Sequence, residues 1–105
     1  MEPLWWALYD FGADVVLAGH AHDYERFAPQ DPSGNLDLTN GIREFVAGTG
    51  GAFHTGTGST KPNSQVFNND TFGVLKLTLR STSYDWQFVP VPGRTFTDSG
   101  SASCH

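Results

Sequence analysis

The strongest constraint on the fold lies in residues 13–22, where a continuous apolar run leads directly into a glycine and two histidines. The run Val15–Ala18 is short, rich in β-branched residues and free of polar positions. Such a run is typical of a strand that is buried on both faces, as in a central or parallel sheet. Gly19 then marks its carboxyl end, where ligands collect in open α/β sheets, so we expect a functional loop to begin there.

A short helix is predicted before this strand, over residues 2–12. Pro3 suits the first helical turn, and Gly12 suits the carboxyl-terminal cap. Apolar side chains at positions i, i+4 and i+7 would give this helix a stripe that faces a core. The stripe consists of Leu4, Leu8 and Phe11, with Trp5 beside them. A helix, a short turn and a buried strand make up one half of an α/β repeat.

Loops and one further strand are predicted in the middle of the chain. Residues 28–40 contain Asp-Pro and Ser-Gly turn signals, and residues 52–70 are polar and rich in Gly, Thr and Asn, so both are expected to be irregular. Residues 42–47 are expected to form a strand that ends in the glycine turn of residues 48–51. That turn is either a simple tight turn or a set of backbone N–H groups for an oxyanion.

A hairpin is predicted near the carboxyl terminus. Alternating leucines in residues 72–79 and alternating aromatic side chains in residues 84–89 indicate two antiparallel strands with one apolar face. The chain is therefore expected to be β-rich with one amino-terminal helix. Residues 95–105 are expected to form a loose tail of small polar residues. The three tryptophans are expected to be core or packing residues: Trp5, Trp6 and Trp86.

Composition excludes several classes of partner. The chain has 105 residues, which allows one domain at most, and a formal charge of −5, so nucleic acid bound through its phosphates is not expected. No apolar stretch approaches the roughly 18 residues of a membrane span. The opening Met1-Glu2-Pro3 lacks the basic and then apolar start of a signal peptide. Cys104 is the single cysteine, so it is either a free thiol or has a partner outside this chain.

His20 and His22 are the candidate metal ligands. In an extended segment residues i and i+2 point the same way, with Cα atoms about 6.5–7 Å apart. The two imidazoles could therefore reach one ion, or two ions about 3.5–4 Å apart. Asp23 and Glu25 are candidates to accept a hydrogen bond from the other ring N–H of each imidazole. The alternative is that the histidines are ordinary polar loop residues, because stable zinc sites normally need three or four ligands.

Other polar residues are weaker candidates. His54 lies in a glycine-rich loop and is expected to be solvated, and His105 is expected to belong to the loose tail. Glu25 and Arg26 are expected to form a partly buried ion pair that holds the histidine loop, with ordinary exposed charges as the alternative.

Residues 19–26, Gly-His-Ala-His-Asp-Tyr-Glu-Arg, resemble the final metal motif of the calcineurin-like metallophosphoesterases. The Tyr-Glu-Arg ending is similar to that of the purple acid phosphatase branch. Residues 45–51 are similar to the next strand and glycine turn of that family, and residues 71–74 together with residues 84–86 resemble its closing hairpin. The resemblance covers most of residues 3–90.

This resemblance implies a fold and an activity. The fold would be the carboxyl-terminal portion of a four-layer α/β/β/α sandwich, and the parent enzyme would be a two-metal hydrolase of phosphate monoesters. His20 would bind the divalent second metal, which is zinc, manganese or iron, and His22 would bind the first, usually ferric, metal. The ions would also offset the repulsion between a phosphate ester and the negative chain.

The family builds its site from five motifs, and this sequence matches only the last. It contains no Gly-Asp followed by a ligand tyrosine and no Gly-Asn-His. The resemblance therefore implies the carboxyl-terminal third of a phosphatase domain that is inactive alone, with Met1 an internal or misassigned start. Cys104 would then pair with a cysteine of the missing amino-terminal part, as in a secreted parent. Two alternatives stay open: a small module that binds a single weak ion, and a structural domain whose histidines only hydrogen-bond within their loop.

Overall fold

The computed structural model describes residues 2–19, 23–50 and 61–105, and within them the chain forms one helix and two β-sheets. The elements are α1 (Glu2–Asp10), β1 (Val15–Ala18), β2 (Tyr24–Phe27), β3 (Arg43–Ala47), β4 (Ser64–Asn68), β5 (Gly73–Leu79), β6 (Ser83–Pro90) and β7 (Ser99–Ser103). The expectation of a mixed, strand-rich fold with one amino-terminal helix is confirmed. In this described part no helix is long and apolar enough to span a membrane.

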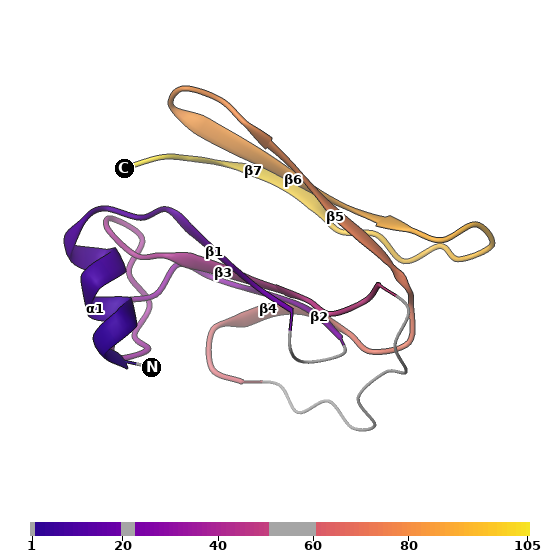
Figure 1. The fold of residues 1–105 in the computed structure, drawn as a ribbon, viewed down its shortest axis with the longest axis horizontal. Coiled ribbons are helices and arrows are strands. Elements are labelled where there is room, and N and C mark those ends of the chain that lie inside the picture. The colour runs from indigo at the N-terminus through magenta and orange to yellow at the C-terminus, as the bar shows by residue number, and fades with distance from the viewer. Residues whose placement is uncertain (1, 20–22, 51–60) are drawn as a thin grey trace.

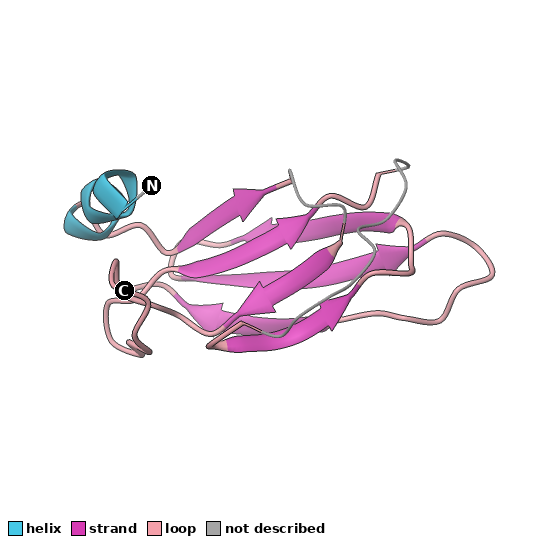
Figure 2. Cartoon of the chain, turned by 90° about the horizontal axis from the view of Figure 1, so that it is seen from below, coloured by secondary structure: helices cyan, strands magenta, loops and turns pink. Residues whose placement is uncertain are grey.

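The strands form two layers that pack face to face (Figure 1). The first sheet has the order β1-β3-β2-β4, in which β1 runs parallel to β3 and the other neighbours are antiparallel. The second sheet has the order β5-β6-β7 and is antiparallel throughout. Figure 2 shows α1 beyond the end of the strands, so it covers neither sheet.

An aromatic core fills the space between the two sheets. Tyr24 and Phe45 of the first sheet are fully buried, and they face Trp86 and Phe88 of the second. The ring centroids of Tyr24 and Phe88 are 4.8 Å apart, and those of Phe45 and Trp86 are 5.5 Å apart. Each ring removes a large apolar area from water, so these residues dominate the stability of the sandwich.

The predicted hairpin is confirmed, including its apolar face. In the register of β5 and β6, Leu75 lies opposite Phe88 and Leu77 opposite Trp86. Side chains alternate along a strand, so the leucines and the aromatics share the inner face. The predicted strand over residues 42–47 is also confirmed as β3.

The predicted helix is confirmed, but its packing is not. Gly12 has a φ of +77°, its N–H donates to the carbonyl of Tyr9, and Ala13 N–H donates to the carbonyl of Leu8. This pair of bonds is the Schellman cap that glycine favours. The stripe, however, faces no core, since Leu4 is 52% exposed and Phe11 is 92% exposed.

Trp6 is 46% exposed and lies outside the core, but it packs edge-on against Tyr9 with ring centroids 6.1 Å apart, as a packing residue would. Three further expectations about local structure are wrong. β1 pairs in parallel as predicted but is an edge strand among the described residues, and its Leu17 is 59% exposed rather than buried. Part of the loop predicted over residues 52–70 forms β4. Residues 99–103 of the predicted loose tail form β7, because their backbone pairs with β6 although their side chains are small and polar.

Candidate functional site

The segment that contains the predicted metal ligands joins β1 to β2. Gly19 follows the end of β1, and Asp23 precedes Tyr24, the first residue of β2. His20, His22 and also His54 lie outside the described residues. Their predicted roles therefore stay predictions, and the site is built from the residues that flank them.

The carboxyl end of β1 and the amino end of β2, which this segment joins, lie on either side of the carboxyl end of β3. β1 is parallel to β3 and β2 is antiparallel to it, so Ala18 lies opposite Val46 and Tyr24 lies opposite Ala47. The N–H of Gly48 donates a 3.0 Å hydrogen bond to the carbonyl of Asp23. The two ends of the segment therefore flank the carboxyl end of β3, which is where ligands collect in sheets with parallel strands.

The glycine turn after β3 has a structural role that the sequence does not indicate. Thr49 is 1% exposed, its hydroxyl donates to the carbonyl of Gly73 at 2.9 Å, and its own carbonyl accepts the Gly73 N–H at 3.0 Å. These bonds connect the end of β3 to the start of the second sheet. With the Gly48 N–H also engaged, the described part of this turn supports the tight-turn interpretation rather than the oxyanion one.

The predicted ion pair between Glu25 and Arg26 is wrong. Neighbouring residues of a strand point to opposite faces, so these two side chains lie on different sides of β2. Arg26 points to the inner face and pairs with Asp98, with 2.7 Å between Nε and Oδ2 and 3.2 Å between Nη2 and Oδ1. The hydroxyl of Tyr24 donates to the same Oδ2 at 2.7 Å. The strand that follows the histidines is thus held to the second sheet by one carboxylate.

Glu25 is buried on the outer face of β2, with 4% of its surface exposed. Its Oε2 accepts no hydrogen bond from any residue that the structure describes. Glu44, on the same face of β3, has its pKa raised by burial, an effect that the nearby Glu25 strengthens and that Lys61 partly offsets. The predicted role of Glu25 as a hydrogen-bond acceptor for an imidazole is not tested by these residues.

The described residues do not complete a metal site. Across residues 2–19, 23–50 and 61–105, no group of three or more His, Cys, Asp or Glu side chains is placed to hold an ion. The two imidazoles are suitable donors for zinc or iron, yet two ligands are fewer than a stable site requires. Any site that uses His20 and His22 therefore needs at least one further ligand.

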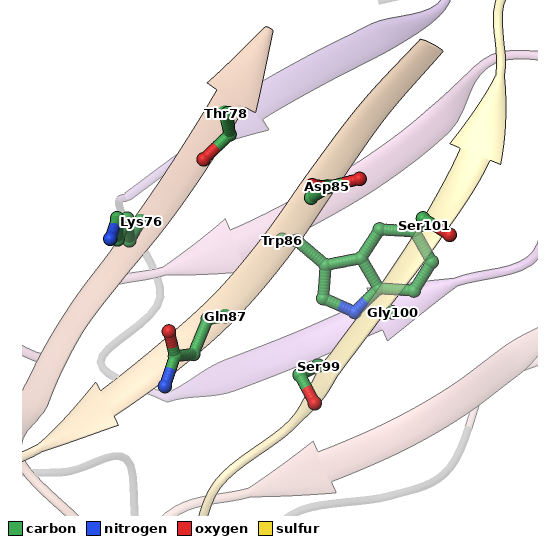
Figure 3. A pocket seen from close by; sticks show the side chains of 8 residues that line it. All are labelled: Lys76, Thr78, Asp85, Trp86, Gln87, Ser99, Gly100 and Ser101. Carbon is green, nitrogen blue, oxygen red and sulfur yellow. The ribbon is translucent and has the colours of Figure 1, made fainter.

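A hollow of about 550 Å³ lies over the outer face of the second sheet (Figure 3). Six of its lining residues have outward side chains: Lys76, Thr78, Asp85, Gln87, Ser99 and Ser101. It contains none of the residues that the sequence predicts for a site. Its single lysine and single aspartate carry opposite charges, as expected of an ordinary solvated sheet face.

Sequence reasoning missed two buried charged residues, of which Asp98 holds the strand that follows the histidines. Asp98 lies in the predicted tail, and Arg43 begins β3 with only 8% of its surface exposed. Arg43 lies between Ile42 and the apolar part of the predicted strand, and a charge inside such a run is a signal that could have identified it. His105, also expected to be loose, contacts Gly41 through Nε2, 2.9 Å from the carbonyl oxygen, and donates its backbone N–H to Asp14 at 2.9 Å.

The chain is similar to two curated proteins whose names describe phosphoesterases. It is 33% identical over 86 residues to "Probable inactive purple acid phosphatase 1" of Arabidopsis thaliana, an alignment that covers 74% of this chain and 14% of that protein. It is 31% identical over 86 residues to "Nucleotide pyrophosphatase/phosphodiesterase" of Hordeum vulgare, covering 74% of this chain and 23% of that protein.

The chain thus spans less than a quarter of the length of these relatives. No family model matches it, and no solved structure matches it. Both names belong to phosphoesterase classes, but they name different branches, and the first describes its protein as probably inactive. The similarity therefore suggests a phosphatase or phosphodiesterase fragment.

Proposed function

We propose that this chain is the carboxyl-terminal part of a two-metal phosphoesterase that hydrolyses phosphate monoesters, and that it supplies His20 and His22 as metal ligands. The names of the two relatives support the reaction class. The Gly-His-Ala-His-Asp-Tyr-Glu-Arg sequence of residues 19–26 supports the metal ligands and the purple acid phosphatase-like branch.

The observation that carries this proposal is the position of the histidine segment in the first sheet. The segment starts at the end of β1 and ends at the start of β2, with the carboxyl end of β3 between them. One end is held by the pairing of β1 with β3, and the other by the bonds of Tyr24 and Arg26 to Asp98 and of Gly48 to Asp23. Catalytic geometry needs such support from packed strands.

In the intact site each imidazole would have to be neutral, so that one ring nitrogen donates a lone pair and the other donates its N–H to an acceptor. Asp23 and Glu25 are the nearest carboxylates in the sequence for that purpose, and both are buried. Bound cations would polarise the phosphoryl oxygens and lower the pKa of a water molecule. His20 is assigned to the divalent ion and His22 to the usually ferric one.

According to the same proposal, the chain by itself has no phosphoesterase activity. Two imidazoles are fewer ligands than a stable metal site requires, and the described residues hold no ligand cluster of their own. The missing ligands, and the phosphate ester substrate that they would bind, belong to the amino-terminal part of the phosphoesterase domain. That part is the proposed partner of this chain.

Cobalt titration of the 105-residue chain tests the metal ligands. Co²⁺ bound to imidazole has visible absorption bands, and we expect one saturable weak site that the His20→Ala and His22→Ala variants each abolish. His105→Ala is the matched control, because that histidine lies at the other edge of the sheet and should leave the titration unchanged. If cobalt binds equally to all four proteins, the assignment of the ligands is wrong.

An activity measurement tests the proposal that the chain alone cannot hydrolyse phosphate esters. With p-nitrophenyl phosphate and added metal, the chain alone should show no turnover near the roughly 1 per second of ordinary enzymes. Turnover at that rate would contradict the proposal that the chain is only part of a site. Loss of several kcal/mol of stability in a metal-free double histidine variant would instead support the structural-domain alternative.

A further inference from the structure

Arg43 is a buried cation without a carboxylate partner among the described residues. It starts β3, is 8% exposed, and points between the two sheets. Its Nε donates to the Tyr84 hydroxyl at 3.3 Å, and its Nη1 donates to the Phe27 carbonyl at 3.0 Å and to Gln65 Oε1 at 2.8 Å. All three acceptors are neutral, whereas buried charges are usually paired.

The neighbouring Arg26 lies in the same environment, but its guanidinium has a carboxylate partner. Both arginines lie over the Trp86 ring, with Cζ 5.0 Å from its centroid for Arg26 and 4.8 Å for Arg43. Arg26 has Asp98 at 2.7 Å. Among the described residues the hydrogen bonds of Arg43 use Nε and Nη1, so Nη2 and the positive charge remain available to another group.

A cavity of about 290 Å³ is lined by Arg43. Tyr84, Gln65 and His105 also line this cavity, and their polar groups are a hydroxyl, an amide and an imidazole. Asp14 also lines it, but this carboxylate accepts the His105 N–H at 2.9 Å and lies 3.4 Å from the Nε2 of the same residue. Asp14 is therefore held by the backbone and ring of His105, whereas Arg43 has no carboxylate partner among the described residues.

The size of the cavity limits what it could hold. Its volume lies just below the roughly 300–1,000 Å³ of pockets that bind drug-sized molecules. A phosphate ion or a short carboxylate would fit. The Tyr84 hydroxyl accepts from Arg43, so its own proton stays available to donate to such an anion.

We propose that this cavity is a binding site for a small oxyanion, with Arg43 as the charge partner and Tyr84 as a hydroxyl donor. The site lies at the amino end of β1, next to Asp14, whereas the histidine segment follows the carboxyl end of this strand. It is therefore separate from the proposed metal site and does not depend on it.

Calorimetric titration with inorganic phosphate tests the site, at constant ionic strength and with EDTA so that no metal at the histidines can hold phosphate. One guanidinium with a few neutral donors should give one saturable site with a Kd of about 1 mM. Arg43→Met should abolish the binding. Arg94→Met is the matched control, because that arginine is 47% exposed and far from the cavity, and it should bind like the wild type.

Tyr84→Phe provides a second variant in case Arg43→Met does not fold. It removes only the hydroxyl, and we expect phosphate binding to weaken roughly 3- to 10-fold. Acetate in place of phosphate distinguishes a carboxylate from a phosphate as the preferred oxyanion. Absence of saturable binding by both anions, equal loss in Arg94→Met, or an unchanged Kd in Tyr84→Phe would each overturn the proposal.

Discussion

Arg26 and Asp98 form a two-bond ion pair between the sheets, with Nε 2.7 Å from Oδ2 and Nη2 3.2 Å from Oδ1. The side chains are 14% and 8% exposed, so water screens this pair little. Arg26 belongs to the strand that follows the histidine segment, and Asp98 directly precedes β7. The pair therefore couples the position of the candidate site to the packing of the second sheet.

Replacing Asp98 should destabilise the whole sandwich. Asp98→Asn leaves Arg26 buried without its counter-charge, and breaking a buried pair from one side costs about 3 kcal/mol. Urea unfolding followed by tryptophan fluorescence measures the loss. Asp85→Asn is the control, since its pair with Arg80 is 38% and 55% exposed and should contribute less than about 1 kcal/mol. Equal losses in both variants would contradict a special role for Asp98.

The pKa of the Asp98 carboxylate predicts how the free energy of unfolding depends on pH. Burial alone would raise the pKa of Asp98, but the hydrogen bonds from Arg26 and Tyr24 outweigh it and hold the pKa below its ordinary value. A group with a lowered pKa in the folded state stabilises the protein above the unfolded pKa of about 3.9, and this contribution is lost as pH falls through the folded value.

We therefore expect the free energy of unfolding of the wild type to fall as pH drops below about 5. Asp98→Asn should show a flatter profile in that range, because the variant has no carboxylate there to protonate. Urea titrations at several pH values measure both profiles. Parallel profiles for the two proteins would mean that Asp98 contributes nothing to the acid sensitivity.

Local patterns in the sequence predicted the elements whose formation depends on near neighbours. The alternation of Leu75 and Leu77 with Trp86 and Phe88 on the next strand determined the hairpin and its inner face. Gly12 determined the end of the helix, because only a left-handed residue completes that cap. These features need no knowledge of distant segments.

Contacts between distant segments could not be predicted in this way. Arg26 and Asp98 are 72 residues apart, so nothing near Arg26 indicates that it binds Asp98 rather than Glu25. The apolar run of β1 does not reveal whether a second strand lies beside it, which is why Leu17 was expected to be buried. For the candidate site, the sequence predicted a functional loop after the carboxyl end of β1 but not the residues that hold β2 in place, such as Asp98.

Gly100 is predicted to be irreplaceable because the Trp86 ring lies against it (Figure 3). A Cβ atom at this position would be 2.5 Å from Trp86 Cζ2 and 3.0 Å from two further ring atoms. The buried ring has no room to move, so Gly100→Ala should destabilise the fold by about 1–3 kcal/mol. Gly50→Ala is the control, because nothing lies within 4 Å of its Cβ position. Thermal unfolding should shift for Gly100→Ala and stay unchanged for Gly50→Ala.

The exposed apolar residues at the α1 end of the first sheet should make the chain self-associate. Among the strands that the structure describes, β1 pairs only with β3, and its sequence contains no charge or proline to protect its other edge. Large exposed side chains lie on this strand, on α1 and on the loop after β2: Leu4, Trp6, Phe11, Leu17, Leu36 and Leu38. Few soluble proteins expose so many large apolar side chains without a partner.

Sedimentation analysis should therefore show a mass that rises with protein concentration. Leu17→Lys places a charge on the open strand, and removing the burial of one leucine, about 1.5–3 kcal/mol, should weaken association at least tenfold. Val74→Lys is the matched control, since Val74 is 61% exposed but lies on the outer face of β5 in the second sheet. If both variants associate like the wild type, the open edge of β1 is not the contact surface.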